Sequence, residues 1–227
     1  MSLKAIVFDF DGVIANSEPL HFQGYRDVLA DQGITLTEDD YYARYLGFDD
    51  LGAFEAIAEH CGAGWTAAQL RDLVARKAVR LEALERDVSV LFPGAADAIR
   101  RAADAMPIAI ASGARGDEIR RVLARADLLA CFTAIVAAED TPKSKPAPDP
   151  YLRAVALLAA RIGGDLTARE VVAIEDSFWG LESARRAGLH TVGVAQTYPA
   201  TALEAADLVI ASVGDISLES LQKLCRE

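Results

Sequence analysis

The sequence predicts an α/β protein with a doubly wound parallel sheet as its core and an all-helical domain inserted into it. Short apolar runs rich in Val and Ile recur along the chain, and from residue 94 onward they alternate with longer helical patterns, which is typical of such a sheet. The stretch between the first two runs far exceeds the roughly 10 to 12 residues that a crossover requires, which indicates an insertion. With 227 residues, 52% of them hydrophobic, the chain can bury a core of this kind.

The apolar runs are predicted to be buried parallel strands, because each one is short and continuously apolar. They cover residues 5–8, 108–111, 134–137, 171–174, 191–194 and 208–210. Segments with helical periodicity follow several of them, at residues 95–105, 118–126, 151–161 and 181–187. A strand alternating with a helix indicates a doubly wound topology.

The inserted stretch is predicted to be a small helical bundle, because it contains no convincing strand pattern. Gly33 is placed to close a first helix, Thr37 can cap a second, and Thr66 with Gln69 forms a capping box before a third helical pattern. The two ends of the insertion are expected to leave the sheet close together. We therefore expect a core domain of residues 1–16 and 90–227, and a helical domain of residues 17–89.

The charge balance argues against polyanionic partners. The chain has 23 Lys and Arg against 34 Asp and Glu, a net charge of 23 − 34 = −11, which disfavours nucleic acid and favours a divalent cation. The three cysteines lack C-x-x-C spacing, and no signal peptide or apolar run of about 20 residues is evident. We expect a cytoplasmic protein with no membrane partner, either a monomer or a weak homodimer.

Two aspartates follow the first predicted strand, at the end where an open α/β sheet binds its ligands. Alternation along an extended segment predicts that the side chains of Asp9 and Asp11 point the same way. Alternatively, these two residues cap the next helix or form a turn at Gly12.

Polar residues also follow other predicted strands. Ser112 and Gly113 come after residues 108–111, where a hydroxyl and free backbone N–H groups could hold a phosphate. Glu175 and Asp176 end the strand at residues 171–174. Lys145 precedes a helix in a proline-rich segment, and in isolation it could be an ordinary surface lysine.

Four carboxylates, a hydroxyl and a lysine are therefore predicted to converge at one edge of the sheet. Like charges at such close range would raise one another's pKa values, whereas Mg²⁺ would bind the carboxylates and neutralise part of their charge. Asp9 could then attack a phosphorus atom while Lys145 offsets charge on the phosphoryl oxygens and Ser112 donates to one of them. Asp11 could protonate the leaving oxygen and then deprotonate water. This chemistry is phosphoryl transfer through an aspartyl phosphate.

Four motifs occur in order along the chain: Asp9-Phe10-Asp11-Gly12-Val13-Ile14, Ala111-Ser112-Gly113, Lys145-Pro146-Ala147-Pro148-Asp149 and Ile174-Glu175-Asp176-Ser177. In these motifs, and over nearly its whole length, the sequence resembles the haloacid dehalogenase-like superfamily. Within it, the chain is similar to the group of β-phosphoglucomutase and the phosphoglycolate phosphatase-like hydrolases. The resemblance implies a Rossmann-like core and a helical insertion that acts as a cap.

The resemblance also implies residue roles. Asp9 would be the nucleophile and Asp11 the general acid and base. Mg²⁺ would be held by Asp9, the backbone carbonyl of Asp11 and Asp176, with Glu175 helping directly or through water. The phosphate ligands would be Ser112, Gly113 and Lys145.

The motifs narrow the chemistry within the superfamily. A dehalogenase is disfavoured because Asp11 is present, and a phosphonatase because the first cap helix offers Arg26 but no lysine for a Schiff base. A sugar phosphomutase stays open, because His21 and Lys77 stand where β-phosphoglucomutase-like proteins have cap residues near the site. Alternatively, His21 is a partly buried helix residue and Lys77 faces solvent.

A loop of the insertion, Leu46-Gly47-Phe48-Asp49-Asp50, departs from the mutase pattern. Alignment on Gly47 brings Asp50 or its neighbour to the position where the sugar-phosphate mutase has an arginine for the distal phosphate. An acid at this position would repel a second phosphate, which favours a hydrolase.

The sequence therefore predicts a Mg²⁺-dependent phosphatase that acts on a small phosphorylated metabolite, such as a sugar phosphate or phosphoglycolate. The alternative is a β-phosphoglucomutase-like phosphomutase. A non-catalytic phosphoacceptor module, like a response-regulator receiver, combines similar residues but has no helical insertion and a different motif order.

Overall fold

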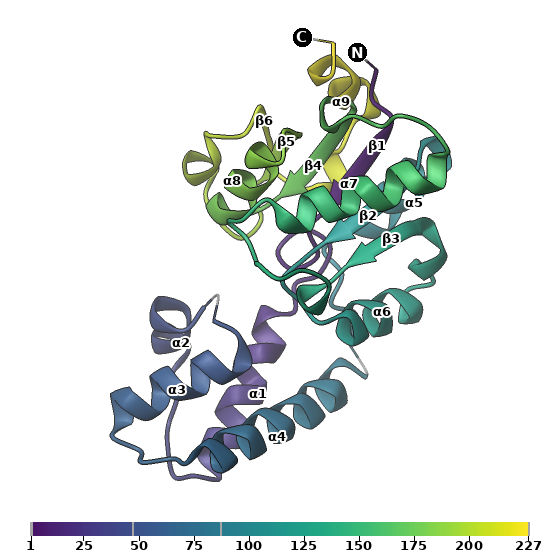
Figure 1. Ribbon diagram of the computed structural model, residues 1–227. Helices are drawn as coiled ribbons and strands as arrows, with labels where there is room; N and C mark the ends of the chain where they lie inside the picture. The colour runs from purple at the N-terminus through teal and green to yellow at the C-terminus, as the bar shows by residue number, and fades with distance from the viewer. Residues whose placement is uncertain (1, 47, 87, 227) are drawn as a thin grey trace. The chain divides into compact units, whose positions relative to one another are not determined.

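The core is a parallel sheet in the order β3-β2-β1-β4-β5-β6, seen in the computed structural model of Figure 1. The structure describes residues 2–46, 48–86 and 88–226. The strands of this described part are β1 Ala5–Phe8, β2 Ile108–Ala111, β3 Phe132–Val136, β4 Val171–Glu175, β5 His190–Val194 and β6 Leu208–Ile210. The predicted doubly wound α/β class is thus confirmed.

Strand β3 differs most from its predicted span. It begins at Phe132 and ends at Val136, whereas the apolar run suggested residues 134–137. As the edge strand beside β2 it is only partly buried, so its sequence carries a weaker apolar signal than the central strands.

The sheet register places the ends of three strands at the same level. In β1, Phe8 pairs with Ile110 of β2 on one side and with Ile174 of β4 on the other. Chain order reverses between β1 and β4, and open α/β sheets bind ligands at such a switch point. The residues that follow β1, β2 and β4 therefore meet at the position where a site is expected.

Helices and short 3₁₀ turns connect the strands of the core. The helices are α5 Ala95–Ala105, α6 Gly116–Arg125, α7 Asp149–Ile162, α8 Phe178–Arg186 and α9 Leu218–Leu224. The 3₁₀ turns are η1 Leu129–Cys131, η2 Ala138–Asp140, η3 Ala168–Glu170, η4 Ala200–Leu203 and η5 Val213–Asp215.

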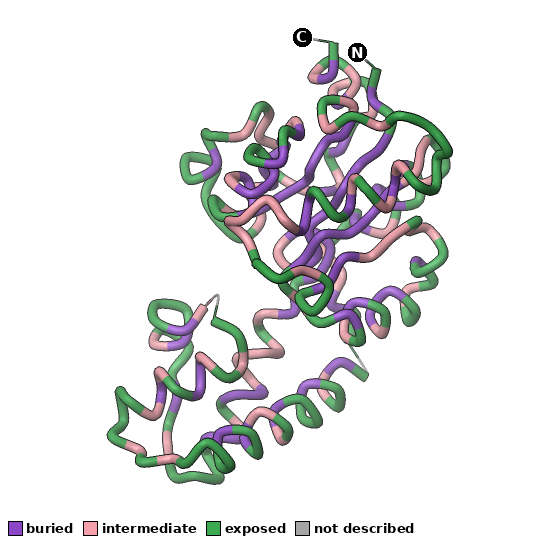
Figure 2. Tube along the Cα trace, viewed as in Figure 1, coloured by how far each residue is buried: buried purple, intermediate pink, exposed green. Residues whose placement is uncertain are grey.

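Helix α7 packs against the alternate residues of the central strands. Tyr151, Ala154 and Leu158 contribute to a buried cluster with Ala5 of β1 and Ala109 of β2. Small side chains on this face of the sheet allow the helix backbone to approach closely. Figure 2 shows the central strands as almost continuously buried, so the strand ends are held rigidly.

The inserted stretch folds into α1 Glu18–Ala30, α2 Glu38–Arg44, α3 Asp50–Cys61 and α4 Ala67–Glu85. Its described residues contain no strand. The predicted caps are present: Thr37 Oγ1 accepts from the backbone N–H of Asp40 at 3.1 Å, and Thr66 and Gln69 form a capping box. Gly33 lies in the turn after α1 with φ of +74°.

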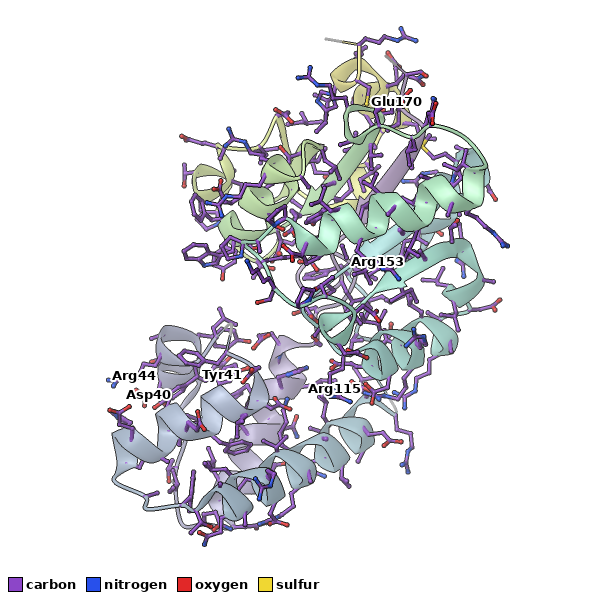
Figure 3. All side chains as sticks on the ribbon, viewed as in Figure 1. Asp40, Tyr41, Arg44, Arg115, Arg153 and Glu170 are labelled. Atoms are coloured by element: carbon purple, nitrogen blue, oxygen red, sulfur yellow. The ribbon has the colours of Figure 1, made fainter. Side chains whose placement is uncertain are left out.

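The core of this helical bundle is aromatic. Tyr41 of α2, labelled in Figure 3, lies with its ring centroid 5.6 Å from that of Tyr25, and Tyr25 packs edge-on against Phe54. The Tyr41 hydroxyl donates to Glu18. These buried rings give the short helices the tertiary support that their length alone would not provide.

The two segments that link the insertion to the sheet lie side by side. Ala15 forms an antiparallel bridge with Leu91, and the N–H of Asn16 donates to the carbonyl of Val90 at 2.6 Å. The chain separates into two compact units, one of Met1–Asn16 with Val90–Glu227 and one of Ser17–Ser89. The expectation that the ends of the insertion are adjacent is confirmed.

Among the helices of the described residues, none combines the length and apolar character that crossing a bilayer requires.

Candidate active site

Three carboxylates meet where β1 and β4 end. Asp9 follows β1 directly, Glu175 is the last residue of β4, and Asp176 follows it. Oxygen atoms of all three lie within 4.8 Å of one another, and all three residues are buried. Parallel pairing of β1 with β4 produces this cluster, because the N–H of Asp9 donates to the carbonyl of Ile174 at 2.9 Å.

Lys145 joins two of these acids. Its Nζ lies 2.9 Å from Asp9 Oδ2 and 2.6 Å from Glu175 Oε1. Burial acts to lower the pKa of Lys145, but the charges of Asp9 and Glu175 outweigh it and hold this pKa above its usual value. These two contacts favour the charged ammonium group, and the alternative of an ordinary surface lysine is wrong because the side chain is largely buried between two acids.

Glu175 is fully buried and held by several donors. The Tyr151 hydroxyl donates to Oε1 at 2.6 Å, the same oxygen that accepts from Lys145, and the Ser177 hydroxyl donates to Oε2 at 3.3 Å. Burial and the charge of Asp9 raise the pKa of Glu175 to about 7. A Cβ at Gly180 would lie 2.0 Å from the Glu175 carboxyl carbon, so only glycine leaves room for this side chain.

Asp176 is in the least favourable electrostatic position. Burial, then the charges of Asp9 and Glu175, raise its pKa to about 8, although a hydrogen bond from Thr197 acts in the opposite direction. Without a further positive charge, the cluster therefore resists full ionisation near neutral pH.

The donor set fits a hard divalent cation. Three carboxylates face one lysine, and the raised pKa values of Glu175 and Asp176 show that one positive charge does not balance them. Mg²⁺ and similar ions prefer oxygen ligands of this kind and would favour the ionised acids. The arrangement is consistent with a metal site, as the motif pattern predicted.

Asp11 does not belong to this group of closely spaced carboxylates. Strand β1 ends at Phe8, so Asp9 and Asp11 both lie beyond its last residue. The chain then turns, with Asp11 bridging to Ala15 and with Gly12 at φ of +74°. The alternation rule does not extend into this turn, and the shared orientation of the Asp9 and Asp11 side chains stays a prediction.

Ser112 and Gly113 lie at the same edge of the sheet, because they follow β2. Ser112 is buried, its N–H donates to the carbonyl of Val136 at 3.0 Å, and its Oγ accepts from the N–H of Ala114 at 3.1 Å. A Cβ on Gly113 would meet no atom within 4 Å, so packing alone does not require glycine there.

The helical unit has a polar cluster of its own. Lys77 of α4 is completely buried, and its Nζ lies 2.6 Å from Asp50 Oδ1 and 2.8 Å from His21 Nδ1. Tyr25 donates its hydroxyl to Asp50 at 2.7 Å, and its ring centroid is 4.7 Å from Lys77 Nζ. The alternative that Lys77 faces solvent is wrong, whereas half-buried His21 does lie on a helix, α1.

Asp50 is already paired with a cation. Burial acts to raise its pKa, but Lys77 outweighs burial and the pKa is lowered. The expectation that Asp50 repels a second phosphate treated its charge as uncompensated, so the structure removes the basis of that argument. Gly47, on which the alignment depended, lies outside the described residues.

The fold and the site together define an α/β enzyme with an acidic, cation-attracting site where the strand order reverses. The chain belongs to the haloacid dehalogenase-like hydrolases, whose family profile matches residues 3–188.

Curated relatives cover most of the chain. Protein CbbY of Rhodobacter capsulatus is 35% identical over 85% of both chains. β-Phosphoglucomutase of Bacillus subtilis (strain 168) is 30% identical over 97% of this chain and 95% of its own. Hexitol phosphatase B of Escherichia coli (strain K12) is 28% identical over 96% of both chains.

A solved structure agrees with the fold. CbbY from Rhodobacter sphaeroides, crystallised in complex with phosphate, superposes with a TM-score of 0.79 at 25% identity, covering 94% of this chain and 96% of its own.

Several residues of the site carried no signal in the sequence. Tyr151 lies in an apolar helical pattern and reads as a core residue, while Thr197 follows β5 without a recognisable motif. Gly180 lies in the first turn of the helix after β4, a position where glycine can indicate close packing. The sequence does not show that the group packed there is the Glu175 carboxylate.

Proposed function

We propose that this chain is a Mg²⁺-dependent phosphatase that hydrolyses a small phosphorylated metabolite, a sugar phosphate or a phosphoglycolate-like ester. The observation that carries the proposal is the position of Asp9: its Oδ2 lies 2.9 Å from Lys145 Nζ, within a cluster of three buried acids. A carboxylate beside a permanent cation is suited to attack an anionic phosphoryl group, because the cation offsets the repulsion between them.

Asp9 is the proposed nucleophile. Its Oδ1 accepts from the N–H of Phe10 at 2.7 Å, which restricts rotation of the carboxylate. Asp9 attacks phosphorus, the bond from phosphorus to the leaving oxygen breaks, and Asp11 gives that oxygen a proton. Asp11 then takes a proton from water as the water oxygen attacks the aspartyl phosphate, which releases inorganic phosphate and regenerates Asp9.

Other residues bind the phosphoryl group and the ion. Lys145 offsets charge on the phosphoryl oxygens, with the Ser112 hydroxyl and the Gly113 N–H as further donors. A bound Mg²⁺ would supply additional charge compensation, and Asp9, Asp176 and the backbone carbonyl of Asp11 are the groups proposed to hold it. Glu175 holds the Lys145 ammonium group in position, because Glu175 Oε1 lies 2.6 Å from Lys145 Nζ.

The relatives support this class of reaction. Hexitol phosphatase B is by its name a phosphatase, and hydrolysis of a small phosphate ester fits the site described above. The helical unit is proposed to act as the cap, with His21 and Lys77 as substrate contacts, an assignment that rests on the resemblance of the sequence.

A phosphomutase is the second candidate, favoured by the 30% identity to β-phosphoglucomutase over 97% of this chain. Such an enzyme returns the phosphoryl group to the substrate rather than to water. With the Asp50 argument removed, the choice between the two reactions depends on the acceptor of the phosphoryl group.

A panel of phosphate esters tests the proposal. The chain is incubated with Mg²⁺ and sugar phosphates, phosphoglycolate and a hexose 1-phosphate, and inorganic phosphate is measured. We expect multiple-turnover phosphate release from at least one ester. Isomerisation of the hexose 1-phosphate with negligible phosphate release would instead establish the mutase.

A further inference from the structure

Gln196 ties together three segments of the core unit. It follows β5, and its Nε2 donates to the backbone carbonyls of Gly12 at 3.1 Å and Val13 at 3.3 Å. Its Oε1 accepts from the N–H of Val213 at 2.8 Å and from the Ser212 hydroxyl at 3.3 Å. Both donors and both acceptor positions of the amide are thereby used, which fixes its orientation.

The next residue, Thr197, reaches the acidic cluster. Its Oγ1 and the Asp176 carboxylate both crowd the same glycine, Gly12, and interaction with Thr197 acts to lower the pKa of Asp176. A Cβ on Gly12 would lie 1.9 Å from Asp176 Oδ2 and 2.8 Å from Thr197 Oγ1. The turn after β1, the Asp176 carboxylate and the Thr197 hydroxyl are thus packed together at one glycine.

These contacts join the two chain segments from which the proposed metal ligands come. Gln196 directs the carbonyls of Gly12 and Val13 toward itself, which restrains the peptide groups next to Asp11. Thr197 Oγ1 packs with Asp176 Oδ2 around Gly12, on one side of the Asp176 carboxylate. Groups that orient the ligands of a metal in this way typically change metal affinity or activity by 10- to 100-fold when they are removed.

We propose that Gln196 and Thr197 are positioning residues for the metal site, a role that rests on the proposed function. Gln196 sets the conformation of the turn that contains Asp11 and Gly12, and Thr197 sets the orientation of the Asp176 carboxylate. Neither residue is in the four sequence motifs, and both lie beyond residues 3–188, the part that the family profile matches.

The test measures Mg²⁺ affinity apart from catalysis. Mg²⁺ is titrated into the metal-free full chain and its apparent Kd is read from the rise in Tm, while kcat and KM are measured separately on the best ester of the panel. For Thr197→Val, which keeps the side-chain shape, we expect the Kd for Mg²⁺ to rise by about tenfold with the metal-free Tm close to wild type. At fixed low Mg²⁺, kcat falls and KM changes little.

Three further variants test whether the effect depends on the hydrogen-bonding groups of Thr197 and Gln196. Thr197→Ser restores a hydroxyl and should return Mg²⁺ affinity to near wild type, which a purely steric role would not do. Gln196→Leu should weaken Mg²⁺ binding by a comparable factor. Thr201→Val, at an exposed threonine of η4, is the matched control and should bind Mg²⁺ as wild type does.

The outcomes separate this inference from the proposed function. A Kd for Thr197→Val within twofold of wild type, in a chain that binds Mg²⁺ and releases phosphate, overturns the inference alone. If wild type binds Mg²⁺ but releases no phosphate, the proposed function fails, while a weakened Kd in Thr197→Val still supports the positioning role. If Mg²⁺ does not raise the Tm of wild type, both are overturned.

Discussion

Each of the two units buries a lysine against acids, but the balance of charge differs. Lys145 in the core contacts Asp9 and Glu175 and lies beside a third acid, Asp176. Lys77 in the helical unit contacts one acid, Asp50, together with His21 and the ring of Tyr25. The first cluster has too few positive charges, whereas the second is paired one to one.

The difference in charge balance between the two clusters changes the pKa values of their acids. In the core, burial and mutual repulsion raise the pKa of Glu175 to about 7 and that of Asp176 to about 8. In the helical unit, Lys77 more than offsets burial and lowers the pKa of Asp50. A buried cluster whose acids have raised pKa values will accept a cation, while one whose acid has a lowered pKa is already satisfied.

The largest expected effect comes from removing the proposed nucleophile. Asp9→Asn should reduce kcat for phosphate release by at least about a thousandfold, because no carboxylate remains to form the aspartyl phosphate. The same change removes one of three crowded charges, so the metal-free protein should be no less stable than wild type in urea unfolding. Normal turnover in this variant would refute the nucleophile assignment.

Removal of the metal should break the activity but not the fold. Treatment with EDTA is expected to lower phosphate release by at least about a hundredfold, because charge compensation at the phosphoryl group is lost. Added Mg²⁺ should restore it, and Ca²⁺ serves as a comparison ion of the same charge. Full activity in EDTA would contradict the metal requirement.

Breaking the balanced pair should act on stability rather than on metal binding. Lys77→Met leaves Asp50 without its cation and should lower the free energy of unfolding by about 3 kcal/mol. Lys143→Met, at an exposed lysine, is the control and should change it by less than about 0.5 kcal/mol. Equal effects of the two substitutions in urea unfolding would show that the Lys77 pair contributes nothing specific.

The two clusters should respond to pH with opposite sign. The raised pKa values of Glu175 and Asp176 stabilise the metal-free fold at low pH, an effect that is lost as pH rises through about 7 and 8. The lowered pKa of Asp50 stabilises the fold above about pH 4, the range of an unfolded aspartate, and this contribution is lost as pH falls.

Two substitutions measured in EDTA separate these contributions. Relative to wild type, Asp176→Asn should gain stability between pH 5 and pH 8. Asp50→Asn should be most destabilised near pH 7 and approach wild type near pH 4. Parallel pH profiles for the two variants would contradict the comparison between the clusters.

The features that the sequence predicts well are those that depend on neighbouring residues alone, such as a buried strand or a polar residue at a strand end. The continuous apolar runs predicted β1 and β2 to the residue, because both are buried central strands. The run at residues 208–210 also matches β6, although β6 is a half-buried edge strand. The rule that ligands bind beyond strand ends predicts that Asp9, Glu175 and Asp176 lie together, and the structure confirms it.

The remainder depends on partners far apart in the chain. The burial of Lys77 follows from Asp50, 27 positions away, and the role of Tyr151 from Glu175, 24 positions away. No periodicity or spacing encodes such pairs. The orientation of Asp11 could not be derived in the same way, because the rule for an extended chain does not carry across the turn that follows β1.

The two segments that link the insertion to the sheet lie side by side, which allows the insertion to be exchanged. The N–H of Asn16 donates to the carbonyl of Val90, so the two ends of the insertion are held together within the core unit. The pairing of the strands therefore does not depend on the residues between these two ends. A different module could be grafted between these two residues, or the present one excised and replaced by a short turn, without shifting a single strand. The inserted module can thereby change while the strands that position the acidic cluster stay in place.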